Sequence, residues 1–301
     1  MSVSFVQYLG LSLSLLEVIR NLMQKISLLL IVILGLVPLS ILSAEERIKI
    51  GVIVPLTGPV AEYGIAAKNG IELALDQDPK LKERFKFIFE DSQYDGKQSL
   101  LAYRKLHDRD GVKIFYIWGY GPSQPVVPVA EREGSYTFSV SAETAIAKNR
   151  ERTVRFCYKI DDIAVDLISY LKSVGSKKVG IFKSEISYMN GLIDSMKTLA
   201  NGVPSIDVID SFTLDVVDFK SPISRLTDKG FDQVGVFLIS GQISQFYKQA
   251  KQQSVKLNSI GTDFFDSSKE VNDSVGTMEG AVFSAPLARA EFKKLYVDKY
   301  G

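Results

Sequence analysis

The sequence contains very little of the two residue types on which many catalytic and metal sites depend. It has one cysteine, Cys157, and one histidine, His107, among 301 residues. A single cysteine excludes an internal disulfide, and a single histidine leaves no Ser-His-Asp or Cys-His set and no His-rich metal site. These counts disfavour a hydrolase or a zinc enzyme, and we expect no metal and no cofactor and assign no catalytic residues.

An excess of charge of either sign is also absent. The chain has 36 Lys and Arg residues against 35 Asp and Glu residues. No excess of positive charge therefore favours binding to nucleic acid or to an anionic membrane surface. A small molecule or another protein is the better partner. The composition, 46% hydrophobic and 24% charged, is that of a globular chain with room for one large domain or two lobes.

The N-terminal region carries a targeting signal. Lys25 precedes the apolar run 26–42, and Ser43 and Ala44 follow it before a polar stretch. This order predicts an export signal that is cleaved near Ala44, and translation from Met23 would give a conventional signal peptide by itself. The run is also close to the length of a membrane-spanning helix, so a retained N-terminal anchor is the alternative.

From Glu45 onward, short apolar runs alternate with longer segments of helical periodicity. This order is typical of parallel strands that are joined by crossover helices. The expected strands lie near 48–54, 85–90, 114–118, 136–140, 178–183, 207–212, 234–240, 259–262 and 280–284. The expected helices lie near 61–78, 97–109, 123–133, 162–174, 189–200, 219–229 and 242–254. Strands and helices alternate in the same way before and after residue 160. Two doubly wound α/β lobes therefore fit the sequence better than one sheet.

Ligands of such sheets bind beyond the carboxyl ends of the strands, where loops meet the N-termini of helices. The first such loop is GVIVPLTGPVAEYG, residues 51–64, in which Tyr63 follows the turn and a packed tyrosine is the alternative interpretation. The second, residues 118–125, resembles a dinucleotide loop, but Gln124 replaces its third glycine and the loop follows the third strand. We reject a nucleotide site there, although Ser123 remains a candidate hydrogen-bonding residue.

Hydroxyl and carboxyl groups mark the remaining loops. Ser141 and Thr144 follow the strand that ends near residue 140, and a helix cap is the alternative role for either. In the second half, the candidate segments are 184–188, 240–242 and 261–263. A carboxylate in such a cleft can pair with a ligand ammonium group.

Several stretches together resemble one known family. In order, they are IKIGVIVPLTGPVAEYG, FEDSQYDGKQSLLAYRKLHDRDGVKIFYIWG, SQPVVPVAEREG, SYMNGL, DFKSPISRLTDKGFDQVGVFLIS and EFKKLYVDKYG. From about residue 48 to 301 the chain is similar to the type I periplasmic solute-binding proteins of the leucine/isoleucine/valine group. The resemblance implies two α/β lobes on a multi-strand hinge, which clamp a ligand and deliver it to an ABC-type membrane permease.

The resemblance also implies domain boundaries. These are a signal peptide or anchor over 1–44, a first lobe over 45–158, a second lobe over 159–282 and a return to the first lobe over 283–301. The chain crosses between lobes near 157–161 and 283–286. The family continues beyond the KYG motif, so we expect a C-terminally truncated chain of lower stability.

The family's ligand-binding positions carry over one by one. Tyr63 matches an aromatic residue beside the ligand side chain, and Ser141 matches a position that binds an α-carboxylate. Tyr188 matches a tyrosine of the second lobe that covers the ligand, and Asp263 matches the acid that meets the α-ammonium group. Ser123 is a further partner in a loop that is about one residue shorter than the family's.

Two departures weaken the assignment of a branched-chain amino acid. Glu143 stands where the family has a carboxylate-binding threonine, and its charge would repel an α-carboxylate unless Thr144 takes that role. Ile239 or Ser240 stands where another tyrosine is expected. The ligand is therefore an amino acid, an amide or a small organic acid.

The resulting hypothesis is a monomeric, extracytoplasmic solute-binding protein that serves ABC permease subunits. Two alternatives stay open. A retained segment at 26–43 would favour a membrane-anchored sensory module. An exported enzyme would need a carboxylate pair such as Asp91 and Asp95, for which surface residues at helix starts are the competing interpretation.

Overall fold

The computed structural model describes residues 18, 20–25, 46–226 and 229–301, and the chain divides into two units, 1–46 and 47–301. Within the first unit, residues 18 and 20–25 are helical. The predicted hydrophobic segment at 26–43 and the cleavage site near Ala44 lie outside the described residues. Among the described residues, no helix has the length and apolar character needed to cross a membrane.

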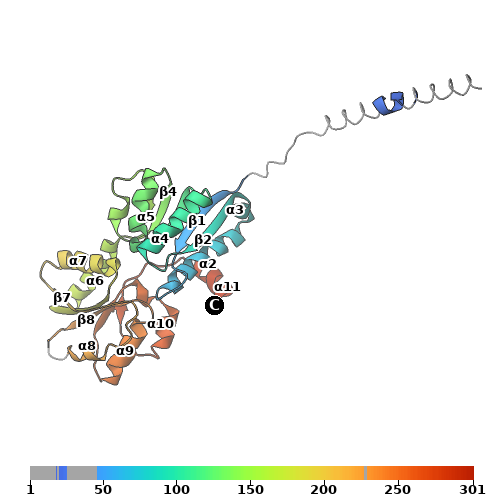
Figure 1. The fold of residues 1–301 in the computed structure, drawn as a ribbon. Helices are drawn as coiled ribbons and strands as arrows, with labels where there is room; N and C mark the ends of the chain where they lie inside the picture. The colour runs from blue at the N-terminus through green and yellow to red at the C-terminus, as the bar shows by residue number, and fades with distance from the viewer. Residues whose placement is uncertain (1–17, 19, 26–45, 227–228) are drawn as a thin grey trace, which may run out of the picture. The chain divides into compact units, whose positions relative to one another are not determined.

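Two parallel five-stranded sheets organise residues 47–301 (Figure 1). The first sheet has the strand order β2-β1-β3-β4-β5. Its strands are β1 (Ile48–Val54), β2 (Phe85–Asp91), β3 (Ile114–Trp118), β4 (Tyr136–Val140) and β5 (Thr153–Arg155). The second sheet has the order β10-β9-β8-β6-β7. Its strands are β6 (Lys178–Ser184), β7 (Ser205–Phe212), β8 (Gln233–Phe237), β9 (Ser259–Gly261) and β10 (Val282–Phe283).

Helices join the strands, as parallel pairing requires. The helices that accompany the first sheet are α2 (Ala61–Gln77), α3 (Pro79–Arg84), α4 (Gly96–Arg104) and α5 (Tyr120–Arg132). Those of the second sheet are α6 (Ile160–Ser173), α7 (Ser187–Ala200), α8 (Lys220–Ser224), α9 (Ile243–Gln252) and α10 (Ser268–Asp273). The last helix, α11 (Ala290–Tyr300), returns to α2, where Tyr300 Oη donates to the carbonyl oxygen of Asn69 at 3.1 Å.

The two sheets have the same topology. Numbered from its own first strand, each has the order 2-1-3-4-5 of a doubly wound sheet. In that order, the connections from the first and third strands leave toward opposite faces, which opens a crevice at the carboxyl ends of the strands. The expected α/β fold with two parallel-sheet lobes is confirmed.

The buried side chains form two clusters. One fills the first lobe around Ile53, Leu106 and Phe115, and the other fills the second lobe. The second cluster also includes Val60 and Ala142, which follow strands of the first sheet. The apolar contact between the lobes is therefore continuous with the core of the second lobe.

The first loop is braced by one carboxylate. Asp91, at the end of β2, accepts hydrogen bonds from the backbone N–H groups of Leu56 at 2.8 Å and Gln93 at 2.9 Å, and from the Thr57 hydroxyl group at 2.5 Å. Partial burial acts to raise the pKa of Asp91, but these hydrogen bonds hold it below the usual value. Asp91 thus fixes the turn that leads into α2.

Several elements differ from the sequence-based expectations. The helix expected over 219–229 is described only over Lys220–Ser224, and the one expected from residue 123 begins at Tyr120. The edge strand β5 is too short, at 3 residues, for an alternating pattern to reveal it. Helix α3 was missed although Asp78 caps it and Pro79 opens it, a combination typical of a helix start.

Candidate functional site

A cavity of about 190 Å³ lies where the carboxyl ends of the two sheets face each other. From the first lobe, Tyr63 projects from α2, Trp118 ends β3 and Ser141 follows β4. From the second lobe, Tyr188 projects from α7 and Asp263 follows β9. The cavity therefore occupies the crevice that the topology of both sheets creates.

Aromatic residues make up half of the residues that line the cavity. They are Tyr63, Tyr94, Trp118, Tyr120, Tyr158, Tyr188 and Phe264. The ring of Tyr63 stacks on Trp118 with centroids 5.5 Å apart and an interplanar angle of 6°. The edge of Phe264 meets the same tyrosine at 5.0 Å and 84°. Because these rings hold one another in place, the wall is preorganised to contact a ligand.

The position of Tyr94 depends on a glycine. Gly119, the one residue between β3 and α5, has a φ of +95°, which L side chains rarely adopt. A Cβ atom at Gly119 would lie 2.5 Å from Cε2 of Tyr94. The glycine thus turns the chain sharply and leaves room for the Tyr94 ring beside Trp118, at a centroid distance of 5.7 Å.

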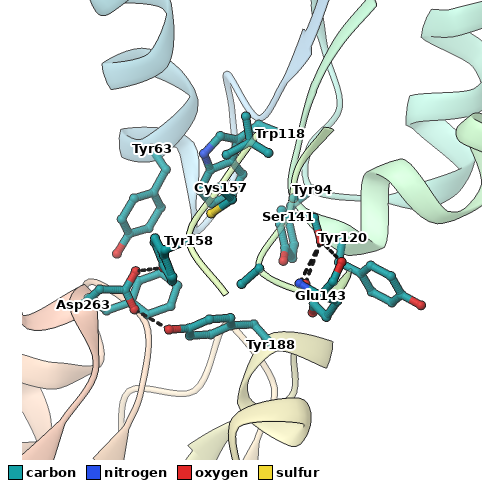
Figure 2. Close-up of a pocket in the computed structure, with 14 residues that line it drawn as sticks. Tyr63, Tyr94, Trp118, Tyr120, Ser141, Glu143, Cys157, Tyr158, Tyr188 and Asp263 are labelled. Carbon is teal, nitrogen blue, oxygen red and sulfur yellow. Dashed lines mark hydrogen bonds between the residues drawn. The ribbon is translucent and has the colours of Figure 1, made fainter. Parts of the chain in front are cut away.

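Two tyrosine hydroxyl groups converge on the carboxylate of Asp263 (Figure 2). Tyr188 donates to Oδ1 at 2.7 Å, and Tyr158 donates to Oδ2. Removal from water raises the pKa of Asp263 in spite of these two hydrogen bonds. A cationic partner in the cavity would reverse that effect by stabilising the charged carboxylate.

A second acid, Glu143, lies on the opposite side of the cavity (Figure 2). The Ser141 hydroxyl group donates to its Oε2 at 2.8 Å and accepts from its backbone N–H at 3.2 Å. The other oxygen, Oε1, is buried and has no hydrogen-bond partner among the described residues. Burial raises the pKa of Glu143 above its usual value.

Behind the cavity, the guanidinium group of Arg155 forms hydrogen bonds to backbone carbonyl groups in and beside the segment that follows β5. Nη1 of Arg155 donates to the carbonyl oxygens of Ser141 at 3.2 Å, Cys157 at 2.6 Å and Tyr158 at 2.7 Å. Burial raises the pKa of the Cys157 thiol to about 11, so the thiol is neutral at physiological pH. The site therefore offers no activated nucleophile at this cysteine.

Four of the six residues that the sequence suggested line the cavity: Tyr63, Ser141, Tyr188 and Asp263. The other two do not. Ser123 is fully buried on α5, where its Oγ lies 2.7 Å from Oγ of Ser139. Thr144 begins the 3-10 helix Thr144–Ala147 and is exposed, so it does not replace Glu143 at the cavity.

The cavity also contains side chains that the sequence did not identify. Tyr94, Trp118, Tyr158 and Phe264 all lie in or next to a connection that follows a strand, which is the one signal that would have marked them. Of the two acids that an enzyme would have needed, Asp95 caps α4 by accepting from Gln98 N at 2.8 Å, and Asp91 braces the first loop. Among the described residues no group of His, Cys, Asp and Glu side chains is arranged to hold a metal ion.

Comparison with known proteins assigns the family. A family model described as "Periplasmic binding protein" matches residues 47–299. The chain belongs to the periplasmic binding protein family. The expected class, a binding protein and not an enzyme, is confirmed by this match, and membership implies an extracytoplasmic location.

Named relatives agree with the expected type I group. The chain is 29% identical over 232 residues to Leu/Ile/Val-binding protein homolog 3 of Brucella melitensis, covering 73% of this chain and 62% of that protein. It is 30% identical over 202 residues to Leu/Ile/Val-binding protein BraC3 of Rhizobium johnstonii, covering 64% and 54%. The chain therefore spans less than two thirds of the length of these relatives.

Solved structures share the fold at lower sequence identity. A leucine-binding protein LivK of Thermotoga maritima has a TM-score of 0.75 at 21% identity, covering 84% of this chain and 76% of that one. A solute-binding protein of an ABC transporter from R. palustris, in complex with benzoate, has a TM-score of 0.74 at 19% identity, covering 84% and 74%. Proteins of this fold thus bind chemically different small molecules.

Proposed function

We propose that the chain is the solute-binding component of an ABC-type uptake system. It clamps an amino acid or a related small polar solute between its two lobes and presents it to a membrane permease. The observation that carries this proposal is a cavity lined by side chains of both lobes. Its wall contains the acids Asp263 and Glu143 and seven aromatic residues. Its volume, about 190 Å³, suits a small solute.

Domain closure supplies the mechanism. The ligand contacts Tyr63 and Trp118 on one lobe and Tyr188 and Asp263 on the other, so it stabilises the closed arrangement over the open one. It shifts that equilibrium by no more than its differential affinity for the two arrangements. No chemical change of the ligand is required, and the permease recognises the closed form.

A thermal-melt screen of the full chain tests this function. The panel contains amino acids, amides, small organic acids and amines, and a ligand that binds the folded form alone raises the melting temperature as its concentration rises. A dose-dependent shift with unchanged ligand recovered afterwards supports the proposal. No shift with any compound, or turnover of the bound compound, contradicts it. Loss of uptake of the same solute on deletion of the gene would support the role in transport.

A further inference from the structure

The cavity has acidic side chains on two sides and no basic side chain. Asp263 and Glu143 both line it, and among the described lining residues none is Lys, Arg or His. Arg155, which lies behind the wall, already donates to three carbonyl oxygens. A ligand with a negative charge would therefore meet two acids and no free cation.

One oxygen of Glu143 lacks a donor. Oε2 is satisfied by Ser141, but Oε1 is buried without a hydrogen-bond partner among the described residues. A buried acceptor without a donor is costly, and buried polar groups in folded proteins are nearly always paired. An N–H group of a bound ligand would supply the missing donor.

The aromatic side chains of the cavity wall also favour a positively charged ligand. Stacked Tyr63 and Trp118, with Tyr94 tilted against Trp118, present ring surfaces to the cavity. The face of an aromatic ring carries negative electrostatic potential and attracts ammonium groups, above all where water is excluded. The rings and the two carboxyl groups thus act together on a cation.

One feature of the cavity favours a negatively charged ligand, but its effect is weak. The first turn of α5 reaches the cavity at Gly119 and Tyr120, and helix N-termini attract anions. In this turn, however, Pro122 has no N–H group, and Gly119 N already donates to Val140 O at 2.9 Å. Two of the four N–H groups that would bind a carboxylate are thus missing or in use.

We propose that this cavity selects a positively charged organic amine that has no carboxylate group. The inference rests on the proposed function, because it specifies the solute of the same cleft. The ammonium group is bound by Asp263 and Glu143, and its carbon chain packs against the rings of Tyr63 and Trp118. An α-amino acid binds more weakly because its carboxylate group faces Glu143.

The affinity for an amine and the affinity for a ligand with a carboxylate group should change with pH in opposite directions. Burial raises the pKa of both acids, so each retains its proton to a higher pH in the empty cavity than in water. Binding an ammonium group requires the charged carboxylates, so the affinity for an amine rises with pH. A ligand carboxylate would accept a hydrogen bond from protonated Glu143, so its affinity would fall with pH.

The other ionisable groups around the two acids do not change this sign. The tyrosines and the thiol nearby have raised pKa values and stay neutral at physiological pH: Tyr63, Tyr94, Tyr158, Tyr188 and Cys157. The charged groups that act on this set are Arg155, Glu62 and Asp266.

Calorimetric titration of the full chain with matched pairs tests the proposal. Each pair differs by one carboxylate: 3-methylbutylamine and leucine, 2-phenylethylamine and phenylalanine, 1,4-diaminobutane and ornithine. We expect at least one amine to bind at least tenfold more tightly than its amino acid, with an affinity that rises with pH. Tighter binding of the amino acids overturns this proposal and leaves the proposed function intact. Binding of neither kind contradicts both.

A variant tests the role of Glu143. Glu143→Gln keeps the shape of the side chain and removes its charge, so the affinity for the amine falls at least tenfold and its pH dependence becomes weaker. The control is Glu83→Gln, an exposed acid on α3, which leaves the affinity unchanged. Unchanged amine affinity in Glu143→Gln would overturn the inference.

Discussion

The hydroxyl group of Tyr158 donates a hydrogen bond to the carboxylate of Asp263, although 105 residues separate them in the chain. Tyr158 belongs to the segment between β5 and α6, and Asp263 follows β9 of the second sheet. Tyr188 completes the arrangement from α7 with a hydrogen bond of 2.7 Å to the other carboxylate oxygen. Three separate connections therefore meet at one partly buried acid of the cavity.

Replacing this acid should separate binding from stability. Asp263→Asn removes the charge that the ligand ammonium group contacts, and losing one partner of a buried charged pair costs about 2–5 kcal/mol of binding free energy. We expect the affinity to fall about 30-fold or more in calorimetric titration. The control, Asp207→Asn, changes an exposed acid on β7 and should bind normally. Equal affinity of Asp263→Asn and the wild type would contradict this role.

The same two acids should make the empty protein less stable as pH rises. A carboxyl group whose pKa is raised by folding holds its proton longer in the folded state, so it reduces stability above its unfolded pKa. Burial raises the pKa of Asp263 and of Glu143. Without ligand, the double variant Asp263→Asn with Glu143→Gln should match the wild-type melting temperature near pH 4 and exceed it at pH 7. A difference that does not change with pH would contradict this assignment.

Ser123 should matter for stability and not for binding. It is buried on α5, and its hydroxyl group pairs with that of Ser139 on β4 at 2.7 Å. Ser123→Ala leaves the Ser139 hydroxyl group without this partner, which costs about 1–3 kcal/mol of unfolding free energy. Removing both hydroxyl groups in a double alanine variant should recover part of the loss. A large fall in ligand affinity, with stability unchanged, would restore Ser123 as a ligand-binding residue.

The fold could be predicted from the sequence because parallel sheets leave a strong local signal. Strands such as β1 and β8 contain the apolar runs 50–54 and 234–237, and the segments between the strands have helical periodicity. The edge strand β5, with 3 residues, carries no comparable signal, whereas β10 lies within the strand expected near 280–284. The pairing of β5 depends on the neighbouring strand, which the local sequence does not reveal.

The candidate site could be predicted only in part. Tyr63 and Asp263 follow strands and lie at the crevice that the topology creates. Ser123 does not line the cavity because successive residues on a helix point about 100° apart, and its side chain turns toward β4. Tyr158 was missed because its contact with Asp263 depends on how distant segments pack together. Sequence order alone does not show that contact.

Glu270 should contribute strongly to the stability of the second lobe. It is fully buried on α10, and it accepts hydrogen bonds from the Ser240 hydroxyl group at 2.9 Å, from Gly241 N and from Ser244 N at 2.7 Å. Ser244 lies in the first turn of α9, where a negative charge is favourable.

Glu270→Ala removes the acceptor of three buried donors at once. We expect a loss of roughly 3 kcal/mol or more of unfolding free energy in urea denaturation, and a smaller loss for Glu270→Gln, which retains one acceptor oxygen. Asp273→Asn on the same helix changes an exposed ion pair with Lys269 and should leave stability nearly unchanged. Similar stability of all three variants would show that the three hydrogen bonds contribute little.

Two glycines of α2 should respond in opposite ways to the same substitution. A Cβ atom at Gly64 would lie 1.8 Å from the carbonyl oxygen of Pro55, a backbone atom that the turn into α2 holds in place. Gly64→Ala must therefore push the helix away from the turn, at a cost of about 3 kcal/mol of unfolding free energy. At Gly70 the nearest atom would be Cζ of Phe292 at 3.9 Å, so Gly70→Ala should stabilise the helix by about 0.5–1 kcal/mol.

The displacement at Gly64 should also reach the cavity, because Tyr63 is the preceding residue and its ring stacks on Trp118. A shift of α2 separates those rings, so Gly64→Ala should weaken ligand binding in calorimetric titration, whereas Gly70→Ala should leave it unchanged. Preorganised contacts lose affinity when their support moves by even about 1 Å. If Gly64→Ala lowers stability while the affinity stays at the wild-type value, the Tyr63 ring is positioned by its aromatic neighbours and not by the packing of α2 on Pro55.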